Sequence, residues 1–267
     1  MQKQDVTAGF QNVDRSDTDF LIQFLVDANR IPSVVESFQT QLTMLNIRDG
    51  DHVLDIGCGI GERAAQMANF VGPAGKVVGT DLSSTMVEAS INRYCDSGLT
   101  LEFYVADACN QPFPDASFDR IRTERVLMYI KDIPAAFSEF HRLLKDNGKL
   151  LVVDFAWDSM VFAHSNTALT RRIAQFICDS FPYGRIGADL YGIFKDFDFH
   201  DIEIKPISYM PPLEFTKRVC GGVIQTGVNE NAFTANEVSD WWEALENDDR
   251  DGKYFMAFQG YIVVGTK

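Results

Sequence analysis

Residues 53–61 read Val-Leu-Asp-Ile-Gly-Cys-Gly-Ile-Gly, and this stretch decides the fold. A short apolar run with strand character enters a turn that carries Gly57, Gly59 and Gly61, and a helical pattern over residues 62–71 follows at once. Glycines at such a turn let the backbone bend sharply and let a ligand approach main-chain N–H groups. The stretch therefore predicts a strand, a ligand-binding turn and a helix of an α/β protein.

The spacing of these glycines separates two kinds of ligand. A dinucleotide-binding turn reads Gly-x-Gly-x-x-Gly, whereas Glu62 stands here in place of the expected third glycine. Asp55 also precedes the first glycine by two positions. Two carboxylates this close to the turn are poorly suited to a doubly negative pyrophosphate. They suit a ligand that carries an ammonium and a sulfonium.

The next two predicted strands also end in carboxylates. Residues 76–80 read as a second buried strand that ends at Asp81, and a third strand over residues 101–106 ends at Asp107. Each acid alone could cap a turn. Acids at the carboxyl ends of successive parallel strands lie at the edge where open α/β sheets bind ligands. Together with Asp55 they predict a binding site at that edge.

The second half of the pattern continues in the same order. Residues 112–119 read Pro-Phe-Pro-Asp-Ala-Ser-Phe-Asp and lead into a fourth strand, which passes into Glu124-Arg125-Val126-Leu127. A helix over residues 133–144 precedes a fifth strand over residues 150–155. In order and spacing, over roughly 110 contiguous residues, these motifs resemble the class I S-adenosylmethionine-dependent methyltransferases. Within that superfamily they are similar to the ubiquinone/menaquinone-type and related small-molecule methyltransferases.

The resemblance implies a complete fold. It is an α/β, Rossmann-like sheet of seven strands in the order 3-2-1-4-5-7-6, with strand seven antiparallel and with helical cap insertions. The implied organisation is an N-terminal helical lid over residues 1–49, followed by a cofactor-binding core over residues 50–157. Residues 158–267 would complete the core with strands six and seven, and would carry cap insertions at about 158–185 and 211–250.

The resemblance also implies S-adenosyl-L-methionine as the cofactor. In such a site Asp81 accepts hydrogen bonds from the ribose hydroxyls, Asp107 bonds the adenine amino group, and Cys58 is a small residue that packs behind the turn. The residues that the resemblance assigns to the cofactor are Asp55, Gly57, Cys58, Gly59, Gly61, Asp81, Leu82, Met86, Asp107, Ala108, Glu124 and Arg125.

Methyl transfer from this cofactor is an in-line displacement, so positioning supplies much of the rate enhancement. A general base is needed only where the nucleophile carries a proton, and histidine is the natural choice. Of the four histidines, only His164 is expected over the cleft, because it follows the fifth strand closely. Tyr129 and Tyr183 are further candidates for a catalytic role.

Composition limits the partners and the compartment. The 267 residues include 24 Lys and Arg against 38 Asp and Glu, a net charge of −14. Such a surface would mostly repel DNA or RNA, so no nucleic-acid partner is expected. Five scattered cysteines without a Cys-x-x-Cys pair argue against a disulfide framework or a metal site. With no long apolar run and no signal-peptide core, we expect a cytoplasmic monomer or homodimer without stable membrane anchoring.

The N-terminal segment and the two insertions should converge above the reacting methyl group. They are rich in aromatic residues, which suit a planar or apolar acceptor and suit an ordinary core equally well. Gln11, Asp14 and Arg15 are polar residues of this segment that either face the cleft or lie at a mobile chain end. The expected function is methyl transfer to an O, N or C nucleophile of a small molecule, in secondary-metabolite biosynthesis.

Two alternatives remain open, namely a quinone- or lipid-type methyltransferase and a non-catalytic scaffold that binds S-adenosylmethionine. A third interpretation is disfavoured. Tyr191 and Lys195 match the Tyr-x-x-x-Lys pair of short-chain dehydrogenases. That family needs a glycine-rich turn at the extreme N-terminus, and the glycine spacing of residues 57–61 is different.

Overall fold

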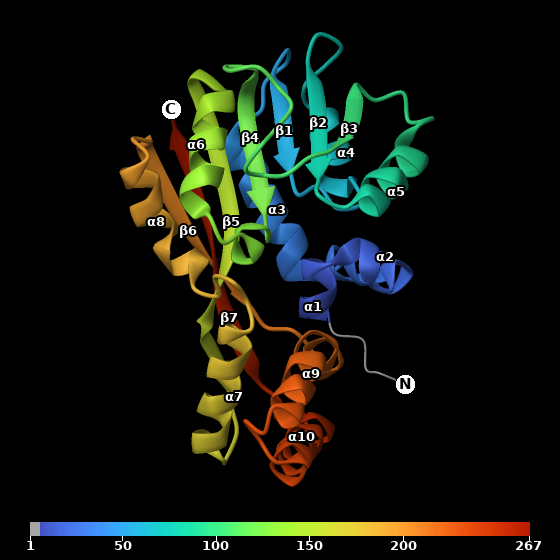
Figure 1. Cartoon of the computed structure of the whole chain (residues 1–267), viewed down its shortest axis with the longest axis vertical. Helices are drawn as coiled ribbons and strands as arrows, with labels where there is room; N and C mark the ends of the chain where they lie inside the picture. The colour runs from blue at the N-terminus through green and yellow to red at the C-terminus, as the bar shows by residue number, and fades with distance from the viewer. Residues whose placement is uncertain (1–5) are drawn as a thin grey trace.

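The computed structural model describes residues 6–267. A seven-stranded sheet in the order β3-β2-β1-β4-β5-β7-β6 runs through the molecule, and β7 is antiparallel to both of its neighbours (Figure 1). The predicted strand order and the antiparallel last strand are confirmed. The first five residues of the predicted lid, including the N-terminus judged to lack a signal peptide, lie outside the described residues.

The strands and helices follow the sequence pattern closely in the first half of the chain. The strands are β1 (His52–Ile56), β2 (Lys76–Asp81), β3 (Leu101–Val105), β4 (Phe118–Glu124), β5 (Leu144–Phe162), β6 (His200–Tyr209) and β7 (Met256–Thr266). The helices are α1 (Val6–Gln11), α2 (Thr18–Ala28), α3 (Pro32–Leu45), α4 (Glu62–Ala68), α5 (Ser84–Tyr94), α6 (Ile133–Leu143), α7 (Thr167–Asp179), α8 (Ile186–Asp196), α9 (Leu213–Asn229) and α10 (Ala235–Arg250), with single 3₁₀ turns η1 (Val13–Arg15) and η2 (Leu127–Tyr129).

The central strands of the sheet are buried on both faces, as strands that are apolar throughout predict, whereas the edge strands β3 and β6 are largely exposed. Successive side chains of a strand point to opposite faces, so Val53 packs in the cluster with α3 and α4 while Leu54 packs in the cluster with α6 and α8. Leu150 and Leu151 of β5 divide in the same way. The two layers of helices therefore hold the central strands in one register and leave their carboxyl ends open.

The fifth strand is longer than the predicted residues 150–155. It continues to Phe162 and pairs with the start of β7 after a register shift between Ala156 and Val161. The polar pair Asp158-Ser159 interrupts the apolar pattern of the strand. The irregular segment accommodates it, since Ser159 Oγ accepts a hydrogen bond from the backbone N–H of Gln259 at 2.8 Å.

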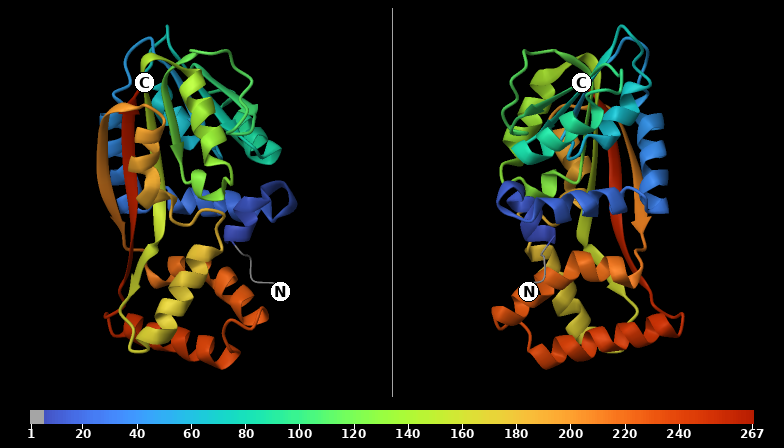
Figure 2. Two further views of the ribbon diagram at one scale, coloured as in Figure 1. Left: turned by 60° about the vertical axis from the view of Figure 1, so that its left-hand side comes forward. Right: turned by 90° about the vertical axis from the view of Figure 1, so that its right-hand side faces the viewer.

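This extension carries a second lobe beyond the carboxyl edge of the sheet. The cap lobe consists of α7, α9, α10 and the adjoining ends of β5 and β7 (Figures 1 and 2). Helices α1 and α2 lie between the cap lobe and the sheet (Figure 2). No helix within residues 6–267 is long and apolar enough to cross a membrane.

One ionisable group is buried in the middle of β5. Asp154 has no exposed surface, and it accepts hydrogen bonds from the backbone N–H groups of Phe155 at 2.9 Å and Met128 at 3.3 Å. Burial raises the pKa of Asp154 to about 7, because an ionised carboxylate loses its hydration there. The group anchors η2 to the sheet in a form that can hold a proton.

We predict that Asp154→Asn flattens the pH dependence of stability. A carboxyl whose pKa is raised in the folded state stabilises fully below its unfolded pKa, and this contribution is lost as the pH rises through the folded value. The wild-type free energy of unfolding should therefore fall by about 2 kcal/mol between about pH 5 and about pH 8 through this group, and the variant should lack that fall. Urea unfolding at the two pH values measures it. Asp146→Asn, exposed on the same strand, is the control; an equal slope in both variants would contradict the assignment.

Candidate functional site

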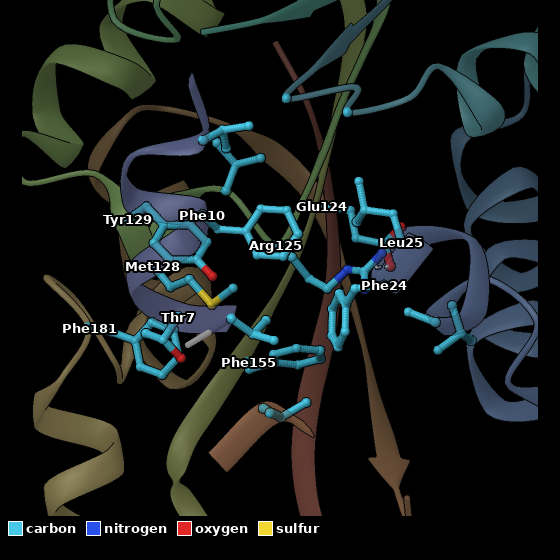
Figure 3. Close-up of a pocket in the computed structure, with 18 of the residues that line it drawn as sticks. Thr7, Phe10, Phe24, Leu25, Glu124, Arg125, Met128, Tyr129, Phe155 and Phe181 are labelled. Carbon is cyan, nitrogen blue, oxygen red and sulfur yellow. Dashed lines mark ion pairs between the residues drawn. The ribbon is translucent and has the colours of Figure 1, made fainter. Parts of the chain in front are cut away.

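A cavity of about 540 Å³ lies between the carboxyl ends of the central strands and the helices α1 and α2 (Figure 3). This volume is in the usual range for small-molecule sites. The predicted site residues that line it are Asp55, Gly57, Cys58, Gly59, Asp81, Leu82, Met86, Asp107, Ala108, Glu124, Arg125 and Tyr129. Gly61 and His164 are not among the residues that line it.

The glycine turn needs glycine for two physical reasons. Gly57 and Gly61 have φ angles of 71° and 72°, in the left-handed region that other residues avoid. A Cβ at Gly57 would collide with the side chain of Val126, and one at Gly61 would come within 2.5 Å of Phe103 Cζ. Gly61 thus supports the turn from behind, and the turn brings backbone close to the cavity.

Asp81 connects this turn to the next helix. Its Oδ2 accepts a hydrogen bond from the N–H of Gly59 at 2.9 Å, and its Oδ1 accepts one from the N–H of Ser83 at 3.0 Å. Burial raises the pKa of Asp81. Beside it, Leu82 is 70% exposed at the rim while Met86 is buried beneath. The acid is therefore fixed at a partly apolar edge of the cavity, as a hydrogen-bond acceptor for a ligand should be.

A buried charge cluster lies beside the glycine turn and consists of Asp55, Arg63, Arg122 and Glu124. The sequence predicted Asp55 and Glu124 for the site, but not Arg63 and Arg122. Arg122 is the centre of the cluster, because its Nη1 donates to Asp55 Oδ1 at 2.7 Å and its Nη2 pairs with Glu124. Its Nε donates to Gln41 of α3 at 2.7 Å. Burial raises the pKa of Asp55 against the opposing effect of Arg122.

The cluster is incomplete on its cavity side. Within residues 6–267, Asp55 Oδ2 and both Nε and Nη2 of Arg63 are buried without a hydrogen-bond partner. Arg63 donates only from Nη1, to Gln66 at 2.8 Å, and its guanidinium lies 4.4 Å from the ring centroid of Phe38. Unpaired buried charges are costly. A ligand with a donor for Asp55 and a carboxylate for Arg63, such as an α-amino acid, would complete both.

Arg63 had no clear signal in the sequence. A basic residue in the first turn of a short helix reads as an exposed side chain, and only the packing of α3 against α4 buries it. Arg122 lies within the fourth strand, and its place in that short segment gives no sign of a role in the site. The burial and the contacts of both arginines arise only when β1, β4 and α3 pack together.

The structure places His164 away from the cavity, although the sequence placed it over the cleft. The reason is the extension of β5, which carries the following residues into the cap lobe. His164 Nδ1 accepts a hydrogen bond from the N–H of Asn166 at 2.9 Å, and its ring stacks on Trp241 with centroids 5.6 Å apart. Tyr129, in contrast, lies on the cavity wall with its ring 5.7 Å from that of Phe181 (Figure 3).

We call the described residues 6–29 the N-terminal strap. Side chains of its helices α1 and α2 form one side of the cavity. Asp14 accepts hydrogen bonds from the side chain of Ser83 and from the N–H groups of Ser84 and Thr85, both at 3.2 Å. The bond from Ser83 is the main reason that the pKa of Asp14 is lowered to about 2. Asp14 therefore binds the start of α5, which Ser83 caps, rather than facing the cleft.

The strap also reaches the cap lobe. Gln11 lines the cavity and donates from Nε2 to the carbonyl of Ser180 at 3.2 Å. Asp27 of α2 pairs with Arg218 of α9 at 2.8 Å. The strap therefore connects the sheet to the cap lobe. Within residues 6–267 no group of three or more His, Cys, Asp or Glu side chains is arranged to hold a metal ion.

We predict that Asp14→Ala loosens the strap without unfolding the sheet. The variant loses the bonds that hold η1 to the start of α5, so residues 6–29 should open more often. Hydrogen exchange followed by mass spectrometry should show severalfold faster exchange in this segment and unchanged protection in β1 and β4. Glu36→Ala, exposed on α3, is the matched control. Unchanged exchange in the strap would show that Asp14 is not its anchor.

Comparison with known proteins gives one family. Residues 54–152 match the family model described as a methyltransferase domain. An uncharacterized 37.1 kDa protein in transposon TN4556 of Streptomyces fradiae is 32% identical over 227 residues, which cover 84% of this chain and 64% of that protein. A ubiquinone/menaquinone biosynthesis C-methyltransferase of Bordetella avium is 40% identical over 111 residues, 42% of this chain and 43% of that enzyme. The chain thus spans less than two thirds of each of these relatives.

Solved structures share the fold at low identity. A phosphoethanolamine N-methyltransferase 2 of Haemonchus contortus, in complex with S-adenosyl-L-methionine, aligns with a TM-score of 0.62 at 21% identity, over 97% of this chain and 60% of that one. The [4+2]-cyclase SpnF aligns with a TM-score of 0.54 at 19% identity, over 87% of this chain and 80% of that one. These likenesses bear on the fold alone.

Proposed function

We propose that the chain is a class I S-adenosylmethionine-dependent methyltransferase, as the match of residues 54–152 to a methyltransferase domain supports, and that it transfers the cofactor's methyl group to a small molecule. The acceptor would offer an oxygen, nitrogen or carbon nucleophile. The observation that carries this proposal is the incomplete charge cluster beside the glycine turn, because its unpaired atoms match the two charged groups of the cofactor's amino acid.

The residues of the cavity fit this cofactor along its length. Asp55 Oδ2 would accept from the ammonium, and Arg63 would meet the carboxylate in charge-assisted hydrogen bonds. Asp81, already fixed by Gly59 and Ser83, would accept from the ribose hydroxyls. The adenine would lie near Leu82, Met86 and Asp107, as the family resemblance implies.

When bound, the cofactor supplies a methyl group made electrophilic by its sulfonium. The chain's own residues would bind and orient the cofactor and shield it from water. The glycine turn and the charge cluster would fix its amino-acid end, and the strap would exclude water. Holding donor and acceptor in line contributes at best on the order of 7–11 kcal/mol. Of the three candidate catalytic side chains, Tyr129 is the one that lies on the cavity wall, so we propose that it contacts the acceptor. We assign no role to His164.

A place in secondary-metabolite biosynthesis remains our preferred role, with methylation of a quinone second. The Bordetella avium enzyme matches only 111 residues, so its likeness says little about the acceptor. We further expect action in the cytoplasm, as a monomer or homodimer and without nucleic acid. A non-catalytic scaffold would bind the cofactor normally and transfer no methyl group to any acceptor.

Calorimetric titration tests the cofactor directly. We expect S-adenosylmethionine and S-adenosylhomocysteine to bind and NADH not to bind. Asp81→Asn should weaken both adenosyl ligands about tenfold or more, because a carboxylate that accepts from two hydroxyls is replaced by an amide. Asp96→Asn, exposed after α5, should bind like the wild type. No adenosyl binding by the wild type would refute the proposal.

A second titration tests the amino-acid end of the site. Arg63→Gln should weaken S-adenosylhomocysteine about tenfold or more, since it removes the partner of the carboxylate. It should leave 5′-methylthioadenosine, which has no amino-acid group, within about twofold. Arg171→Gln, on the exposed face of α7, is the control. Equal losses for the two ligands would mean that Arg63 only supports the fold.

A further inference from the structure

The cavity has two chemically different ends. Every charged residue that lines it lies between residues 55 and 131, at the carboxyl edge of the sheet. The lining residues from α1, α2, α9 and β7 carry no charge; the main ones are Phe10, Phe24, Phe215, Val219, Cys220 and Met256. We call this part the acceptor end. It extends beyond the residues that the cofactor would use.

The cations of α9 are turned away from the acceptor end. Arg218 pairs with Asp27 of the strap at 2.8 Å, and Lys217 pairs with Glu246 of α10 at 2.6 Å. The face of α9 toward the cavity presents Val219 and Cys220 instead. A phosphate in the acceptor end would find no cation on that wall, and desolvating an unpaired phosphate is strongly unfavourable.

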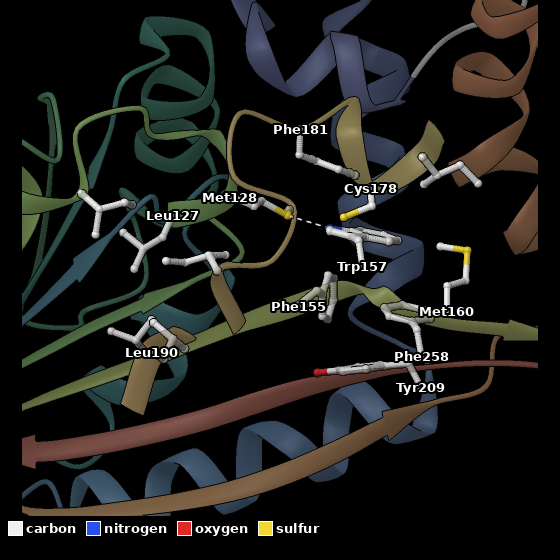
Figure 4. Packing of buried hydrophobic residues seen from close by; sticks show 14 of the residues in the cluster. Leu127, Met128, Phe155, Trp157, Met160, Cys178, Phe181, Leu190, Tyr209 and Phe258 are labelled. Carbon is white, nitrogen blue, oxygen red and sulfur yellow. Dashed lines mark hydrogen bonds between the residues drawn. The ribbon is translucent and has the colours of Figure 1, made fainter. Parts of the chain in front are cut away.

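The walls of the acceptor end are aromatic. Phe24 and Phe215 stack with ring centroids 5.2 Å apart and planes 23° apart, which joins the strap to α9. Below them, Trp157 stacks between Phe181 at 4.8 Å and Phe258 at 5.0 Å (Figure 4). Such walls favour a ligand that buries apolar, planar surface.

One cation stands at the boundary between the two ends. Arg125 has a φ of 59°, which directs its side chain away from the strand and into the cavity near Phe24 (Figure 3). Its Nε lies 3.7 Å from Glu124 Oε1, too far for a strong hydrogen bond. The guanidinium can therefore meet one negative oxygen of a second ligand.

We propose that the methyl acceptor is a hydroxylated aromatic molecule without a phosphate, a proposal that rests on the function proposed above. Its ring lies in the acceptor end, and its oxygen lies toward Arg125, which favours the phenolate. The phenol would lose its proton to bulk water as it enters the cavity beside Tyr129, before the methyl transfer. An oxygen electron pair would then form the new C–O bond to the methyl carbon, and the C–S electrons would stay on sulfur. The products are an aryl methyl ether and S-adenosylhomocysteine.

The test uses the full chain saturated with S-adenosylhomocysteine and three probes in calorimetry: 2-naphthol, naphthalene and phosphoethanolamine. We expect 2-naphthol to bind best, naphthalene more weakly and phosphoethanolamine not at all. The family resemblance assigns Arg125 to the cofactor, whereas this proposal assigns it to the acceptor. Arg125→Gln should therefore remove the difference between 2-naphthol and naphthalene while leaving S-adenosylhomocysteine within about twofold. A matching loss of S-adenosylhomocysteine would assign Arg125 to the cofactor and overturn its role here.

Two substitutions at one position test the acceptor end. Val219→Lys should weaken 2-naphthol about tenfold or more by placing a charge in the apolar wall, with cofactor binding as the check on folding. If the lysine variant does not fold, Val219→Trp tests the same wall. It fills the space with apolar atoms and should likewise weaken 2-naphthol binding. Lys217→Ala, on the outward face, is the control. Phosphoethanolamine binding, or no naphthol binding, with S-adenosylhomocysteine still bound, would overturn this inference alone; loss of S-adenosylhomocysteine binding by the wild type would overturn the proposed function.

Discussion

The buried ion pair between Arg122 and Asp55 is the interaction on which the site depends. It joins the ends of β1 and β4 where both strands are buried, and the bond from Arg122 to Gln41 adds α3 to the same network. Removing one partner of such a pair leaves an uncompensated buried charge, at a typical cost of about 3–5 kcal/mol. The glycine turn starts two residues after Asp55, so its position follows from this pair.

Local sequence patterns predicted where most of the strands lie and which residues form most of the cavity's charged end. The glycine spacing, the acids at Asp81 and Asp107 and the apolar strands are all short-range signals, and each belongs to a segment of fewer than about ten residues. The strand order came from resemblance to a family rather than from these signals. Placement of the acids together needed no more than the rule that parallel strands end at one edge.

The features that the sequence did not predict share a physical cause, because each depends on contact between segments that are distant in sequence. The extension of β5 depends on pairing with β7, about a hundred residues later, and that pairing decides where His164 lies. Burial of Arg63 depends on α3, and the hydrogen bonds that Asp14 adds at the N-terminus of α5 come from a residue 69 positions before Ser83. A periodicity read along one segment contains none of this information.

The two ends of the cavity also differ in whether the matched methyltransferase model covers their residues. The charged end lies within residues 54–152, the stretch that the methyltransferase model matches. The acceptor end is assembled from α1, α2, α9 and β7, which lie outside that stretch. Substitutions at Phe215 or Val219 can change the acceptor without touching the charge cluster. The proposed choice of acceptor therefore rests on residues outside the matched stretch, and those from α1, α2, α9 and β7 that line the cavity carry no charge and include several aromatic side chains.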